Sequence, residues 1–115
     1  MHELAICLSL IRLIEQNIAA AEPPVKAIKS IRLEIGQLVG IELEALRFSF
    51  PIAAAHTVAQ NATLEIQVQK GEVFCQPCQQ NVMIASRLMP CPMCSQYDYE
   101  IIQGTNLKIV HIEVI

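Results

Sequence analysis

Hydrophobic positions recur at helical spacing over residues 4–20, close to the start of the chain. One apolar stripe follows intervals of three and four residues and consists of Leu4, Cys7, Leu8, Ile11, Ile14 and Ile18. A second stripe on another face consists of Ile6, Leu10 and Leu13. Because one stripe is enough to cover a core, the second indicates either a helix buried on both sides or a surface for a partner. Pro23 and Pro24 predict the end of this helix.

Three later segments alternate between apolar and polar residues, which is the pattern of half-buried strands. They lie at 31–35, 64–69 and 106–114. Between the first two, residues 41–50 predict a second helix, whose inward residues are Leu43, Leu46 and Phe50. We expect Pro51 to kink or stop this helix, because proline lacks the N–H that a helix interior needs.

Four of the five cysteines form one block between the second and third predicted strands. Cys75 and Cys78 make one C-x2-C pair, and Cys91 and Cys94 make a second pair after twelve intervening residues. A C-x2-C turn directs two thiolates to one centre, and two such turns supply the four sulfurs of a closed structural zinc site. We therefore predict zinc at these four cysteines. Cys7 stands apart and is expected to be a small buried hydrophobe.

Other chemistries fit the same four cysteines less well. Two disulfides or a redox-active dithiol pair are one alternative, and an iron site of the rubredoxin type is another. The doubled motif argues against the first, as does a reducing compartment, where disulfides rarely persist.

The order of these elements predicts an α/β (α+β) fold with a small three-stranded sheet, two helices and an inserted zinc-ribbon-like module. Because the third strand most simply returns to the sheet begun by the first two, residues 1–70 and 105–115 are assigned to the α/β domain. Residues 71–104 are assigned to a zinc-binding domain. An insert of this size buries little core. The metal is expected to stabilise it, by about 10–16 kcal/mol of apparent binding free energy in zinc-finger peptides.

Charge and hydropathy exclude several classes of protein. The chain has 115 residues and a net charge of −3, whereas a nucleic-acid binder would normally carry a basic face. The longest apolar stretch, near the N-terminus, is interrupted by Arg12, Glu15 and Gln16 and is shorter than the roughly 20 residues that span a bilayer. It also lacks the basic region and cleavage site of a signal peptide. We expect a soluble, cytoplasmic protein.

The sequence offers no catalytic machinery. It contains no P-loop, no glycine-rich dinucleotide motif and no H-E-x-x-H motif. A zinc ion with four protein ligands has no open position for hydrolysis, and its thiolates are not free nucleophiles. We therefore predict that the protein is not an enzyme. His56 and His111 are expected to be solvated side chains.

His2 differs from the other histidines because its imidazole lies beside the α-amino group of Met1. The Met1 amine, the His2 amide nitrogen and the imidazole can close two adjacent chelate rings on one metal ion. A fourth donor could come from the Glu3 amide, a side chain or water. Planar, nitrogen-rich sites suit nickel(II) and copper(II). The alternative is that His2 and Glu3 simply begin a helix, where the helix dipole favours a carboxylate.

Three motifs together resemble the HypA/HybF family. They are MHE at the start, RLEIGQLVGIELEALRFSF in the middle and C-x2-C-x12-C-x2-C near the end, and they cover essentially the whole chain in the family's order. Members of this family are nickel metallochaperones for the maturation of nickel–iron hydrogenase, with an α/β nickel-binding domain and a zinc domain. The resemblance implies that Ni²⁺ is a transported cargo and that Zn²⁺ is structural.

The resemblance also implies roles for individual residues. His2 would be the essential nickel ligand, and Met1 and Glu3 would contribute through the N-terminal backbone. The implied zinc ligands are Cys75, Cys78, Cys91 and Cys94. The implied partners are the GTPase HypB and the hydrogenase large subunit. Two positions depart from the family pattern: Ser95 replaces the usual glycine after the final cysteine, and Pro51 falls where related chains continue a helix.

Two competing classes make different predictions. A zinc-ribbon interaction adaptor without nickel delivery would expose a basic and aromatic platform, but the charges around the cysteines are mixed in sign. A dithiol oxidoreductase would need reducible cysteines. The two-sided first helix and the linkers of the insert also leave room for a homodimer, including one that exchanges elements between chains.

Overall fold

A computed structural model describes residues 2–115, which divide into two compact units. The first, called here the α/β unit, holds the residues before Glu34 together with Ile41–Glu65 and Ile109–Ile115. The second, called the cysteine unit, holds Glu34–Gly40 and Ile66–Lys108. These two units are defined by how the chain packs. The domain bounds expected from the sequence divide the chain by metal binding instead, and they stay a prediction.

Two helices pack against each other in the α/β unit. Helix α1 spans Glu3–Ile18 and α2 spans Leu43–Ala54. The buried residues of α1 are Cys7, Ile11 and Ile14, all from the first apolar stripe. No helix within residues 2–115 is long and apolar enough to cross a membrane.

The second apolar stripe of α1 is only partly covered. Leu13 is 49% exposed, whereas Ile6 and Leu10 are half-buried. The stripe is therefore neither a full core face nor a fully open surface, and its role as a partner surface stays a prediction.

Pro51 does not stop α2, which continues to Ala54, so a stop is wrong, while the alternative expectation of a kink stays a prediction. The last turn is fixed by packing, because Phe50, Ala53 and Ala54 are all buried. Pro51 is exposed, as is Arg47, whose backbone carbonyl loses its N–H donor to the proline. Tertiary burial here outweighs the local preference of proline.

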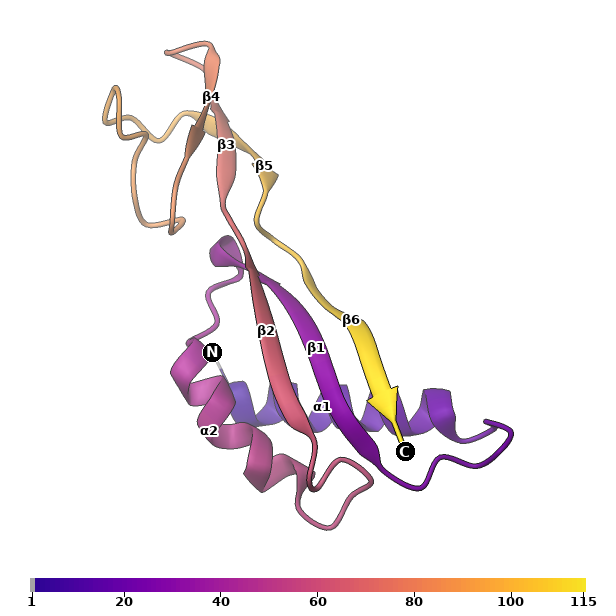
Figure 1. The fold of residues 1–115 in the computed structure, drawn as a ribbon. Helices are drawn as coiled ribbons and strands as arrows, with labels where there is room; N and C mark the ends of the chain where they lie inside the picture. Colours follow the sequence, from indigo (N-terminus) through magenta and orange to yellow (C-terminus); the bar gives the residue numbers. More distant parts are fainter. Residues whose placement is uncertain (1) are drawn as a thin grey trace. The chain divides into compact units, whose positions relative to one another are not determined.

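A three-stranded mixed sheet has the order β2-β1-β6, as Figure 1 shows. Strand β1 spans Ile28–Gly36, β2 spans Thr63–Gln69 and β6 spans Leu107–Val114. β1 and β2 run in the same direction with α2 between them in sequence, and β6 runs in the opposite direction (Figure 1). Two helices with this sheet confirm the predicted fold class.

The central strand β1 has one apolar and one polar face. Ile31, Leu33 and Ile35 are at most 2% exposed and belong to the core. On the other face, Arg32 Nε lies 3.0 Å from Glu65 Oε2 of β2. The alternation predicted from the sequence therefore separates the buried face from the solvated face.

A second, antiparallel sheet lies in the cysteine unit and has the order β4-β3-β5. Strand β3 spans Glu72–Cys75, β4 spans Gln80–Met83 and β5 spans Tyr99–Gln103. The core of this unit is small, and its buried residues are Leu38, Val73, Cys75, Val82, Ile84 and Cys91.

Leu38 reaches this core from a distant part of the sequence. It lies in η1, a short 3-10 helix at Gln37–Val39 that follows β1, and it is only 2% exposed. Its N–H donates to the carbonyl of Gly104 at 2.8 Å, and its own carbonyl accepts from Arg87 Nε at 2.8 Å. The cysteine block is therefore completed by a residue far upstream of it.

Gly36 and Gly104 allow two backbone segments of the cysteine unit to approach closely. A Cβ at Gly36 would lie 2.0 Å from the carbonyl oxygen of Gly104. Gly104 has a φ of 107°, which side chains rarely adopt. Glycine is thus required where the chain leaves β1 and where it enters β6.

Candidate metal centre

The structure brings Cys75, Cys78, Cys91 and Cys94 together. Cys75 ends β3, Cys78 lies in the turn to β4, and the second pair lies between β4 and β5. Their Sγ atoms all lie within 4.8 Å of one another, and the Sγ atoms of Cys75 and Cys94 are 3.5 Å apart. A tetrahedral zinc site with Zn–S distances of about 2.3 Å places its sulfurs roughly 3.8 Å apart. The four sulfurs therefore fit one zinc ion.

Both C-x2-C pairs fold into the same turn. The N–H of Gln79 donates to the carbonyl of Cys75 at 2.8 Å, and the N–H of Ser95 donates to that of Cys91 at 2.8 Å. Gln79 and Ser95 have positive φ values of 53° and 63°. Ser95 therefore keeps the left-handed turn despite its departure from the family's glycine.

Ser95→Gly is expected to stabilise the cysteine unit by about 1 kcal/mol. A left-handed conformation costs a non-glycine residue roughly 1–2 kcal/mol. Glycine avoids this cost but loses more conformational entropy on folding, so the net gain is smaller. Competition with a chelator should then remove zinc more slowly from the variant than from the parent. Ser86→Gly is the control and should destabilise the cysteine unit, because it removes the Ser86 Oγ that accepts a hydrogen bond from the N–H of Leu88 at 3.0 Å. A faster loss of zinc from Ser95→Gly would show that this turn is not strained.

The thiols of Cys75, Cys78 and Cys91 are not equally acidic. Burial, followed by hydrogen bonds with the other cysteine sulfurs, raises the pKa of Cys78 to about 12. Burial is also the main cause of the raised pKa of Cys75. At Cys91 burial acts in the same direction, but hydrogen bonds from the N–H groups of Cys94 and Met93, together with those from the Cys75 and Cys94 side chains, outweigh it and lower the pKa to about 7. Because zinc binds thiolates, a zinc ion held here would compete with protons and would bind less tightly as the pH falls.

Two tyrosines hold the loop that leads to Cys91. Tyr97 Oη donates to the carbonyl of Leu88 at 3.1 Å, and Tyr99 Oη donates to that of Met89 at 2.9 Å. Sequence reasoning did not assign these tyrosines a role, because no spacing in the chain indicates which carbonyls they reach.

The predicted nickel-binding end lies at the start of α1. His2 is the N-cap residue, is exposed, and makes no side-chain capping hydrogen bond. The Glu3 carboxylate accepts the N–H of Glu42 at 3.3 Å, and Glu42 is the N-cap of α2. Met1 lies outside the described residues. The imidazole is therefore accessible to a metal, while the residue after it is tied to the second helix.

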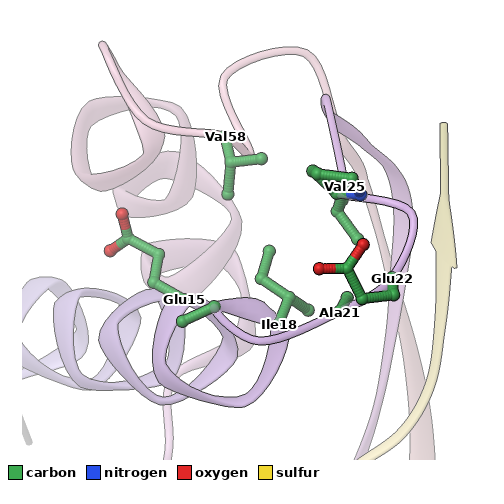
Figure 2. Close-up of a pocket in the computed structure, with 8 residues that line it drawn as sticks. Glu15, Ile18, Ala21, Glu22, Val25 and Val58 are labelled. Atoms are coloured by element: carbon green, nitrogen blue, oxygen red, sulfur yellow. The ribbon is translucent and has the colours of Figure 1, made fainter.

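A cavity of about 320 Å³ also lies in the α/β unit, near the end of α1. Figure 2 shows the carboxylates of Glu15 and Glu22 beside an apolar surface that includes Ile18, Val25 and Val58. The eight residues that line it provide no histidine or cysteine. The cavity therefore adds no nitrogen or sulfur ligand to the metal chemistry of the chain.

A helix-and-sheet unit with an accessible histidine at its start, together with a four-cysteine cluster, defines a metal-binding protein of two parts. The family model described as "Hydrogenase/urease nickel incorporation, metallochaperone, hypA" matches residues 1–114. The chain belongs to this HypA family of nickel metallochaperones of hydrogenase maturation, and it is not an enzyme.

Full-length relatives support the same assignment. The hydrogenase maturation factor HypA of Alkalilimnicola ehrlichii is 34% identical over 114 residues, 99% of each chain. That of Beijerinckia indica is 36% identical over 115 residues, all of both chains. The solution structure of the Ni metallochaperone HypA from Helicobacter pylori shares the fold, with a TM-score of 0.66 and 22% identity over 100% of this chain and 98% of the other.

Proposed function

We propose that this chain carries Ni²⁺ at its N-terminus for insertion into nickel–iron hydrogenase and holds Zn²⁺ at Cys75, Cys78, Cys91 and Cys94. Family membership establishes nickel handling, and the observation that supports the location is the exposed, uncapped imidazole of His2 at the start of α1. The amine of Met1 and the amide nitrogens of His2 and Glu3 would complete a nitrogen-rich set suited to nickel. Such an open site releases its cargo more easily than a closed cage.

The zinc ion would be resident rather than transported. Four sulfurs leave no open coordination position, and the ion would link the two C-x2-C turns across a small core. Zinc would thereby stabilise the cysteine unit.

The partners of this chain are other components of the maturation pathway. We propose that they include the HypB-type GTPase and the hydrogenase large subunit, which donate nickel to or accept it from a carrier. The exposed Leu13 of α1 is available for such a contact. We place these encounters in the cytoplasm, where the cysteines stay reduced and able to bind metal.

Metal analysis of protein with its native N-terminus tests this assignment. We expect one zinc per chain after purification, with sulfur neighbours at about 2.3 Å by X-ray absorption. Titrated nickel should fill one further site with nitrogen and oxygen neighbours while the zinc stays bound. Displacement of zinc by nickel, with no second site filled, would contradict the proposed division between resident metal and cargo.

A further inference from the structure

Two carboxylates line the cavity at the end of α1, those of Glu15 and Glu22. Four other glutamates each form an ion pair with a lysine or an arginine, namely Glu34, Glu44, Glu65 and Glu113. No ion pair within residues 2–115 includes Glu15 or Glu22. The cavity therefore presents negative charge that a cation from outside the chain can neutralise.

The end of α1 adds to this negative charge. Glu15 lies in the last turn of α1, which contains no basic residue. The carbonyl groups of a last turn have no helical N–H donors, and the helix dipole gives this end a partial negative charge. A carboxylate here lowers the stability of the helix, so Glu15 breaks a local rule of helix formation. Such departures are expected at functional sites.

The rest of the cavity is lined by apolar residues. Figure 2 shows the Ile18 side chain between the carboxylates of Glu15 and Glu22. The other six lining residues, Ile18 among them, are all apolar, whereas a hard metal ion is usually surrounded by oxygen ligands. The volume of about 320 Å³ is near the lower end of the roughly 300–1,000 Å³ of ligand pockets. The cavity therefore suits one organic cation with an apolar part.

An arginine side chain matches these features better than other cations do. Its guanidinium group presents five N–H donors in a planar fork, so it can bind two carboxylates at once. Its alkyl stem packs along apolar surface, and its charge is more weakly hydrated than that of an ammonium group. A lysine offers a strongly hydrated point charge instead, and the two carboxylates would repel a phosphate-bearing ligand. Charge and shape together therefore identify arginine as the occupant.

We propose that this cavity receives an arginine side chain of a partner protein, with the guanidinium group between Glu15 and Glu22 and the alkyl stem against Ile18. Arginine in a pocket is a common anchor of protein interfaces. His2 and Glu15 are about 20 Å apart along the helix at the 1.5 Å rise per residue. A partner anchored here therefore leaves His2 accessible. The proposal does not rest on the nickel assignment, because no residue of the cavity is a proposed metal ligand.

An NMR titration of the zinc-loaded protein with Nα-acetyl-arginine methylamide tests this proposal. Amide signals of residues 18–25 should shift, with a Kd on the order of 1 mM for a single side chain. The citrulline analogue, which has nearly the same shape and no charge, should bind at least about tenfold more weakly. E15Q and E22Q should each weaken arginine binding about threefold, and the double variant about tenfold. E100Q changes an exposed glutamate outside the cavity and is the control, with unchanged binding.

Two further measurements separate the proposal from its alternatives. Thermal unfolding of E15Q should be no lower than that of the parent, since the helix dipole disfavours the carboxylate, so weaker binding does not come from a damaged fold. A peptide with one arginine between alanines should bind more tightly than propylguanidine, because a partner also contributes its backbone. Equal binding of the arginine and citrulline probes, or unchanged binding by the double variant, would overturn the proposal. Propylguanidine binding at least as tightly as the peptide would assign the cavity to a small molecule instead of a partner protein.

Discussion

Replacing His2 with alanine is expected to abolish nickel binding at neutral pH while zinc content and fold stay unchanged. Loss of an outer-shell partner typically lowers metal affinity by about 10–100-fold, so loss of a direct ligand should cost at least about 100-fold. The fold should tolerate the change, because the imidazole is exposed and makes no capping hydrogen bond. Isothermal titration with nickel measures the loss.

The matched control is His56→Asn, which removes another exposed imidazole. His56 has a φ of 62°, and asparagine tolerates this conformation better than alanine does. The control should bind nickel as the parent does. Normal binding by His2→Ala would place the nickel site elsewhere in the chain.

A variant with extra residues before Met1 separates the two nitrogen donors proposed at this end. If the α-amine is a ligand, extension or acetylation should weaken nickel binding even though His2 is intact. If the extended protein binds as tightly as the native one, the imidazole is needed but the free amine is not. Affinity should also fall as the pH is lowered, because protons compete with the metal for nitrogen donors.

Cys78→Ala is expected to release zinc and to unfold the cysteine unit while the α/β unit stays folded. We expect the cysteine unit, which has a small buried core, to depend on the metal, because zinc binding contributes about 10–16 kcal/mol in zinc-finger peptides. Hydrogen exchange should then lose its protection in β3, β4 and β5 and keep it in α1. Zinc content, measured on the same samples, should fall well below one per chain.

Cys7→Ala is the control for this experiment, because it makes the same change at a buried cysteine outside the cluster. Cys7 Sγ donates a hydrogen bond to the carbonyl of Leu46 at 3.6 Å and lies in the buried core of the α/β unit. We expect full zinc content and a loss of about 1 kcal/mol of stability, as is typical of single substitutions. Unchanged zinc and unchanged protection in Cys78→Ala would show that this residue is not needed to bind the metal.

Much of this architecture follows from short-range sequence patterns. Helical spacing places α1, alternation places the three strands of the mixed sheet, and the doubled C-x2-C motif gathers the four cysteines. These features are predictable because each depends on neighbours within a few residues.

The features that the sequence did not predict depend on distant partners. Burial of Phe50, Ala53 and Ala54 carries α2 past Pro51. The contacts of Tyr97 and Tyr99 depend on where a loop folds back. Their carbonyl partners are not marked by any residue type, so no local pattern can identify them.

Because Leu38 belongs to the core of the cysteine unit, the four-cysteine segment cannot be transferred to another protein by itself. A graft of residues 71–104 into another scaffold would carry every sulfur ligand but would leave the place of the Leu38 side chain empty. Truncation of a buried leucine to alanine typically costs about 2–5 kcal/mol of stability. A core as small as that of the cysteine unit has few other contacts to offset such a loss. The same discontinuity acts during synthesis on the ribosome, because Leu38 emerges before all four clustered cysteines and stays without its packing partners until they follow. A grafted protein would therefore need η1, Gln37–Val39, as a second segment that packs against residues 71–104.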